Sequence, residues 1–101
     1  MVMQNSERPP EAYVVRVAER SPRQISRAND EVSKLALGKT EVIKWKSSDG
    51  RDIEGLLTYP VGYVAGTKVP LILNIHGGPA GVFQQSFIGN RGSYPIATFA
   101  S

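Results

Sequence analysis

The chain has 101 residues, of which 41% are hydrophobic and 21% are charged. This is the composition of a globular protein, and the length allows one small domain with a modest core. The absence of cysteine excludes a disulfide framework and a thiolate metal site. The longest apolar run, at residues 71–73, is too short to cross a bilayer, and the polar first ten residues lack the apolar region of a signal peptide. We therefore expect no membrane partner, and the compartment stays open.

The net charge of +3 does not indicate a nucleic-acid-binding protein. The densest positive group is Arg20, Arg23 and Arg27, but Glu19 and Asp30 lie beside it and no aromatic residue is interleaved. A nucleic-acid interface would need a basic face uninterrupted by acidic residues. This spacing is more typical of a solvated surface.

The distribution of charge divides the chain into two parts. All nine carboxylates lie at or before Glu54, and the only formal charges after it are Lys68 and Arg91. A solvated first part followed by a part that is covered on most sides would produce this difference.

The first third of the chain predicts two strands and a short helix. Residues 11–18 are rich in β-branched and aromatic side chains, and residues 23–26 form a second, shorter candidate strand after a Ser-Pro turn. A helix is expected over residues 31–37, with Asn29 or Asp30 as its cap. It would have about two turns and would be marginal without packing partners.

A β-hairpin is the strongest structural signal in the sequence. Residues 40–47 alternate, with Ile43 and Trp45 on one face. The opposite face carries Val42, Lys44 and Lys46. Asp49-Gly50 then provides a turn, and residues 52–59 form the return strand.

A continuous apolar run follows the hairpin. Residues 60–68 contain two glycines and predict a surface connection, whereas residues 69–75 are apolar apart from one asparagine. Such a short run is typical of a strand that is buried on both faces. A glycine-rich segment, residues 76–81, comes next, and Ser93 could cap a final helix that begins near Pro95.

The glycine-rich segment does not fit a nucleotide or metal site. Gly78 and Gly81 match the last two glycines of a dinucleotide fingerprint, but His76 occupies the first position and no carboxylate follows Glu54 to bind a ribose. The glycine-rich segment also contains no Gly-Lys-Ser/Thr phosphate-binding triplet; the triplet Gly38-Lys39-Thr40 lies far before it and lacks the first glycine of that motif, since Ser33 stands there. His76 is the only histidine, and a single ligand does not make a metal site. We therefore expect no cofactor and no metal.

The segment His76-Gly77-Gly78-Pro79 fits an oxyanion loop better. Serine hydrolases of the α/β type place a backbone N–H after the third strand of the sheet, where it meets the developing negative oxygen. Glycine allows the backbone to approach the substrate closely, sometimes at a φ that other residues avoid. The order of hairpin, connection, buried strand and glycine loop agrees with this hypothesis.

Four segments together resemble the prolyl oligopeptidase family of serine peptidases. Residues 45–50 with 53–57 resemble the start of its catalytic domain, and residues 69–79 resemble its third strand and oxyanion loop. The acylaminoacyl peptidase and dipeptidyl aminopeptidase-like branch is the most similar. Residues 9–14 resemble the last blade of that branch's β-propeller, and residues 23–26 resemble the outer strand that follows.

The resemblance implies an α/β fold of which this chain is an incomplete part. Residues 1–38 would be a remnant of the last β-propeller blade and its linker. Residues 39–101 would be the first segment of the hydrolase domain. In the parent enzyme, a propeller would filter peptide substrates and a Ser-Asp-His triad would cleave them.

The resemblance also implies roles for the loop residues. The backbone N–H of Gly78, with that of Gly77, would form the oxyanion hole. His76 and Pro79 would be structural, and His76 would not be the base of the triad.

The triad itself is missing from the chain. After Gly78 the serines are Ser86, Ser93 and Ser101, none of which has the flanking glycines of a nucleophile elbow. No acidic residue and no second histidine follow, so a serine hydroxyl would have no base to activate it. We expect the chain alone to be inactive and poorly folded or prone to aggregation. A fragment of an esterase or lipase, and a small non-catalytic β-rich module that binds a protein partner, are the alternatives.

Overall fold

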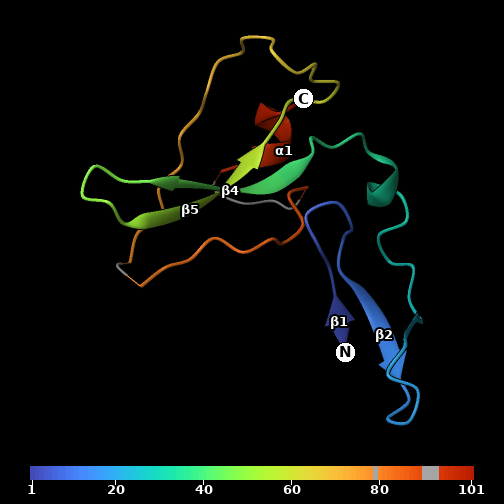
Figure 1. Ribbon diagram of the computed structural model, residues 1–101. Coiled ribbons are helices and arrows are strands. Elements are labelled where there is room, and N and C mark those ends of the chain that lie inside the picture. The colour runs from blue at the N-terminus through green and yellow to red at the C-terminus, as the bar shows by residue number, and fades with distance from the viewer. Residues whose placement is uncertain (79, 90–93) are drawn as a thin grey trace.

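The computed structural model describes residues 1–78, 80–89 and 94–101. Its elements form two separate antiparallel sheets and two very short helices (Figure 1). In chain order they are β1 (Val2–Met3), β2 (Glu11–Val15), β3 (Pro22–Gln24), the 3₁₀ helix η1 (Val32–Lys34), β4 (Thr40–Lys46), β5 (Asp52–Thr58) and α1 (Ile96–Phe99). The first sheet has the order β1-β2-β3, and β4 pairs with β5 in the second.

The predicted hairpin is confirmed. β4 and β5 pair in register from Thr40 opposite Thr58 to Lys46 opposite Asp52. The turn is closed by a hydrogen bond from the Gly50 N–H to the Ser47 carbonyl, 2.9 Å long. Gly50 has a φ of +84°, which explains why Asp-Gly predicts this turn so well.

The two faces of the hairpin differ in chemistry, as the alternation predicts. On one face Lys44 pairs with Glu54 at 2.5 Å and Lys46 pairs with Asp52 at 2.7 Å, each across the two strands. On the other face the Trp45 ring lies over Gly55, where an added Cβ would be 3.1 Å from the indole. Cross-strand pairs of both kinds stabilise an antiparallel pair.

The two strands predicted in the first third of the chain are present but shorter, and they belong to a three-stranded sheet. β2 ends at Val15 because the next residues form a tight turn, in which the N–H groups of Glu19 and Arg20 donate to the Arg16 carbonyl. β3 spans Pro22–Gln24, so it begins one residue before the predicted strand at residues 23–26 and ends two residues earlier. β1 was not expected from its polar surroundings. It is held to β2 by backbone bonds such as that from the Tyr13 N–H to the Met1 carbonyl, 2.8 Å long.

The helices are shorter than predicted. η1 covers three residues of the predicted 31–37 helix, and its N-cap residue is Glu31 without a side-chain cap bond. Asn29 does not cap it, and its side-chain amide donates to the Pro10 carbonyl. α1 begins beside Pro95 as expected, whereas the cap proposed at Ser93 lies outside the described residues.

The prediction of a buried strand over residues 69–75 is wrong for this structure. The segment is assigned no strand, and its apolar side chains are exposed, Leu71 by 78% and Ile75 by 77%. A central strand needs partners on both edges and a layer on each face. No described part of the chain pairs with it in a sheet. The observed sheets are small and antiparallel, consistent with a partial α/β fragment but without the sheet of a complete hydrolase.

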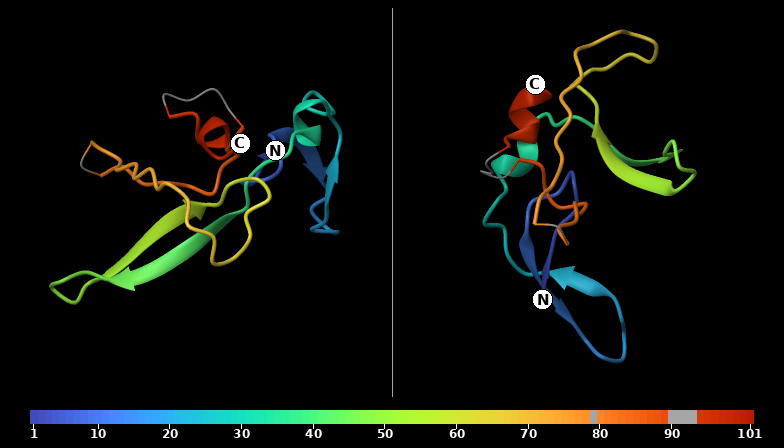
Figure 2. Two further views of the ribbon diagram at one scale, coloured as in Figure 1. Left: turned by 90° about the horizontal axis from the view of Figure 1, so that it is seen from above. Right: turned by 90° about the vertical axis from the view of Figure 1, so that its left-hand side faces the viewer.

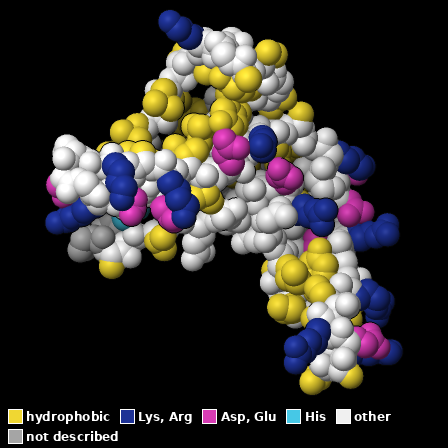
Figure 3. Space-filling model, viewed as in Figure 1, with side chains coloured by type: hydrophobic (Ala, Val, Ile, Leu, Met, Phe, Trp, Pro, Cys, Tyr) yellow, Lys and Arg dark blue, Asp and Glu magenta, His cyan; other side chains and the backbone are white. Residues whose placement is uncertain are grey.

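The molecule is open and has little core. Its radius of gyration is 16.4 Å, whereas a compact chain of this length has about 13 Å. Figure 2 shows the hairpin and the three-stranded sheet as separate arms joined by the intervening chain. In the described part, the buried hydrophobic residues are Phe87, Ile88 and Ala100. Hydrophobic side chains reach the surface over much of the face in Figure 3.

Two hydrogen bonds between residues far apart in the sequence lie at the small core. Phe87 is 3% exposed, and its N–H donates to the Gln4 side chain at 3.3 Å. At the base of the hairpin, the Val61 N–H donates to the Ala100 carbonyl at 2.7 Å, which holds the end of α1 there. None of the helices among the described residues is long and apolar enough to span a bilayer.

Candidate functional site

The glycine loop that follows the apolar segment has a backbone that glycine alone adopts readily. Gly78 has a φ of +92°, in the region that side chains with a Cβ rarely occupy. Gly81 returns close to Gly77, since a Cβ added at Gly81 would lie 2.4 Å from the Gly77 carbonyl oxygen. Both positions are therefore restricted to glycine by backbone geometry, Gly78 by its φ and Gly81 by close approach.

The amide hydrogens of this loop face no competing acceptor in the described part of the chain. Neither the Gly77 N–H nor the Gly78 N–H donates a hydrogen bond to a described residue. Both glycines are exposed, and a Cβ added at either would meet nothing within 4 Å. The space beside each of these two Cα atoms is therefore open among the described residues. Pro79, the last residue of the motif, lies outside the described residues.

His76 packs within its own loop. Its ring lies edge-on to Phe83, with 5.4 Å between ring centroids, and its Nδ1 is 3.4 Å from the Gly77 carbonyl oxygen. Within residues 1–78, 80–89 and 94–101, no group of three or more His, Cys, Asp or Glu side chains could hold a metal ion. These contacts hold the His76 ring against its own loop.

The described serines after the loop are used for local structure. The Ser101 hydroxyl donates to the Thr98 carbonyl at 2.8 Å, and the Ser86 N–H donates to the Gln84 carbonyl at 2.7 Å. Neither serine forms a hydrogen bond with His76 in the described structure. Ser93 lies outside the described residues. Neither of these two serines is thus brought together with His76.

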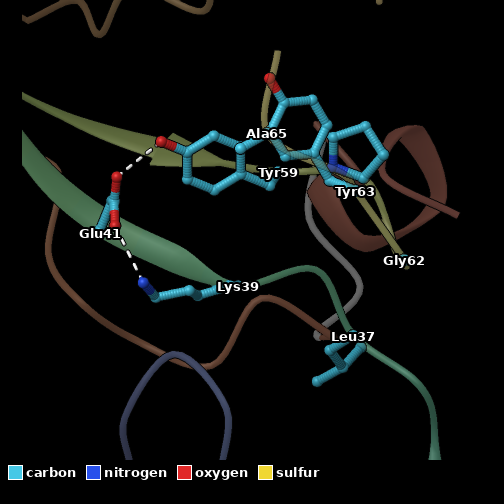
Figure 4. Close-up of a pocket in the computed structure, with 8 residues that line it drawn as sticks. Leu37, Lys39, Glu41, Tyr59, Gly62, Tyr63 and Ala65 are labelled. Carbon is cyan, nitrogen blue, oxygen red and sulfur yellow. Dashed lines mark hydrogen bonds and ion pairs between the residues drawn. The ribbon is translucent and has the colours of Figure 1, made fainter. Parts of the chain in front are cut away.

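A second group of polar residues lines an open hollow at the base of the hairpin (Figure 4). The Tyr59 hydroxyl donates to Glu41 at 2.6 Å, and the Lys39 ammonium lies 3.1 Å from the other oxygen of that carboxylate. Tyr63 stacks on Tyr59 with 5.0 Å between ring centroids. The hydrogen bond from Tyr59, with help from Lys39, lowers the pKa of Glu41, and the same bond raises the pKa of Tyr59. Neither group changes its protonation state near neutral pH, so their hydrogen bond persists there and is suited to holding the hairpin base closed.

Sequence reasoning missed a third group, centred on Glu11. This carboxylate begins β2 but is only 7% exposed, and Ser26 and two backbone amides bind it. The available signal was its position, because an acidic residue that opens an apolar strand directly after Pro9-Pro10 needs a partner if it points inward.

Comparison with known proteins gives one informative similarity. No family model matches the chain, and no solved structure matches it. The chain is 36% identical over 74 residues to a Bacillus subtilis (strain 168) protein named "Uncharacterized peptidase YuxL". The match covers 72% of this chain but 11% of that protein, so the chain spans a small part of its length. Any contiguous stretch of this size in the chain includes the whole β4–β5 hairpin. The similarity supports a peptidase-like origin for the chain.

Proposed function

We propose that this chain is a segment of a serine peptidase of the prolyl oligopeptidase family. It would contain the junction between the β-propeller and the hydrolase domain, and it would supply the loop that stabilises the oxyanion. One observation carries the proposal: Gly78 adopts a φ of +92° directly after His76-Gly77, in a chain similar to a protein named as a peptidase.

The chemistry of the loop follows from the exposed amides. When a nucleophile attacks a peptide carbonyl, negative charge develops on the carbonyl oxygen. Fixed N–H donors stabilise that charge, and one donor contributes roughly 3 kcal/mol. The N–H groups of Gly77 and Gly78 would serve this purpose, because neither donates a hydrogen bond to a described residue.

The remaining groups of the reaction would come from elsewhere in the parent protein. His76 is packed against Phe83 and contacts neither Ser86 nor Ser101 by a hydrogen bond. A serine without a neighbouring base is a poor nucleophile. The 101 residues alone are therefore expected to have no peptidase activity, and a peptide would be the substrate of the complete enzyme.

The two sheets support the proposed division at residues 38 and 39. The meander β1-β2-β3 is antiparallel, as are the four-stranded blades of β-propellers. The β4–β5 hairpin lies wholly in the second part and comes before the glycine loop. We propose that residues 1–38 belong to the propeller side and residues 39–101 to the hydrolase side.

The proposal is tested first by the DNA that follows codon 101. A reading frame that supplies G-x-S-x-G and then an Asp and a His is expected, and its full product should react with a fluorophosphonate probe at that serine. A stop with no such region nearby would contradict the proposal. A product that hydrolyses aryl esters but no peptides would indicate an esterase instead.

The role of the loop is tested in that full product by Gly78→Ala. A Cβ at a φ of +92° is strained, so the N–H should leave its position. We expect kcat to fall by about 10²-fold with little change in KM, as for the loss of one oxyanion donor. An unchanged kcat would remove Gly78 from the mechanism.

A further inference from the structure

Glu11 is a buried carboxylate with an unusually complete set of partners. It is 7% exposed, and it accepts hydrogen bonds from the Ser26 hydroxyl, the Ala28 N–H at 3.2 Å and the Asn29 N–H at 2.7 Å. Burying a charge without such partners would be costly. All these donors belong to one short stretch of chain, residues 26–29.

That stretch is where the chain leaves the three-stranded sheet toward the hairpin. The Ser26 hydroxyl also accepts from the Ala12 N–H at 2.8 Å, and the Asn29 side chain donates to the Pro10 carbonyl at 2.7 Å. Side chains of each segment, residues 10–12 and residues 26–29, are thereby hydrogen-bonded to the backbone of the other. Glu11 lies at the centre of the contacts.

We propose that Glu11 is a positioning residue, whose ionised carboxylate fixes the course of residues 26–29 as the chain leaves the sheet. The bonds to two successive backbone amide groups set the direction of the chain, which a purely apolar contact would not do. The positioning itself is independent of the enzymatic role proposed above. In a peptidase, the consequence would be a fixed path for the chain as it leaves the propeller side, and this consequence rests on the proposed function.

The ionised form is the one that fits. Three donors converge on the two oxygens, and a carboxylate is acceptor-only, whereas a glutamine would present an NH₂ donor toward one of them. The hydrogen bond from Ser26, followed by those from Asn29 and Ala28, lowers the pKa of Glu11 despite its burial.

No opposite charge is needed to explain this site. The charged residues nearest along the adjoining segments are Glu7, Arg8, Arg23, Arg27 and Asp30, and the Met1 ammonium lies directly before β1. None of them forms an ion pair with Glu11 among the described residues. A lowered carboxyl pKa means that the stabilisation is present above the ordinary value of 4.5 and is lost as the pH falls through the lower folded value.

Amide hydrogen exchange in the 101-residue chain tests the proposal. In Glu11→Gln, we expect the protection of the Ala28 and Asn29 amides to fall about tenfold near neutral pH. The Gly50 amide, which is bonded within the distant hairpin turn, should keep its protection. Glu7→Gln is the matched control, since Glu7 is an exposed carboxylate four residues earlier.

The pH profile separates positioning by charge from mere packing. In the wild type, the protection factors of Ala28 and Asn29 should fall as the pH is lowered through the depressed pKa of Glu11, and in Glu11→Gln they should not depend on pH. Equal protection in the wild type and Glu11→Gln would overturn the proposal. So would a loss of protection that extends to Gly50, because Glu11 would then contribute to general stability. Neither result bears on the reading frame test of the peptidase, so the two proposals fail separately.

Discussion

The β4–β5 hairpin and the apolar segment at residues 69–75 both have sequences that predict strands, but their structures differ. The hairpin forms its full register, with ion pairs on one face and Trp45 over Gly55 on the other. The segment at 69–75 is richer in apolar residues, yet it has no strand assignment and exposes its side chains. The two segments differ in whether a strand that can pair follows nearby in the chain.

For the hairpin, the partner follows after a turn of a few residues, so closing the loop costs little entropy. The turn residues themselves favour closure, because Gly50 adopts its positive φ without strain. For residues 69–75, no strand of the described chain pairs with the segment. A strong strand pattern thus indicates what a segment can form, and the structure depends on whether its neighbours are present.

The largest effect is expected from breaking the base of the hairpin with Gly38→Ala. A Cβ at Gly38 would lie 1.9 Å from the Tyr59 carbonyl oxygen and 3.2 Å from the Ala100 Cβ. Because the nearest atom belongs to the backbone, the strands must move apart, and we expect a loss of about 1–3 kcal/mol in the free energy of unfolding. Urea denaturation followed by Trp45 fluorescence measures it.

Gly77→Ala is the control for this substitution. Gly77 has no atom within 4 Å of an added Cβ and no positive φ, so its replacement should leave the denaturation midpoint unchanged. Equal midpoints for Gly38→Ala and the wild type would show that the close approach at the hairpin base does not restrict this position.

A smaller and pH-dependent effect is expected from Tyr59→Phe. The hydroxyl donates to Glu41, which lowers the pKa of Glu41 and raises that of Tyr59. The bond should stabilise the hairpin between these values. Its contribution is lost as the pH falls through the lowered Glu41 value, or as it rises through the raised Tyr59 value.

Thermal unfolding measured across this pH range tests the bond. The wild type should lose stability at both ends, and Tyr59→Phe should remove the part of each loss that comes from this pair. Tyr94→Phe, at an exposed tyrosine, should behave as the wild type. Identical pH profiles for all three proteins would mean that the bond does not contribute to stability.

The sequence predicted those parts of the fold whose partners are close in the chain. The hairpin was predicted to within one residue at each strand's end, because alternation and Asp-Gly act locally. The helix over 31–37 was predicted too long, since the backbone of Leu35 is already extended and ends η1 at Lys34. β1 could not be predicted, because its pairing with β2 depends on contacts across a loop of polar residues.

For the candidate site, too, the sequence predicted a local feature and missed contacts between distant residues. The requirement for glycine at position 78 was foreseen from the motif, and the structure gives Gly78 a positive φ. The oxyanion role of Gly77 and Gly78 stays a prediction. The Glu11 contacts were missed because their donors lie 15 to 18 residues away, and the local signal, an acidic residue at the start of an apolar strand, does not identify those donors. Side-chain hydrogen bonds of this kind depend on how the chain returns, which periodicity does not encode.

The smallest effect on stability is expected from Leu73→Lys, which tests the other side of the comparison. Leu73 is 76% exposed in the unpaired segment, so a charge there should change the free energy of unfolding by less than about 0.5 kcal/mol. The same charge should reduce self-association, because an exposed apolar strand-forming segment is prone to pair between molecules. Sedimentation velocity at increasing concentration measures that change. A large loss of stability in Leu73→Lys would mean that residues 69–75 do have a partner within the chain, and the contrast with the hairpin would then have to be explained in another way.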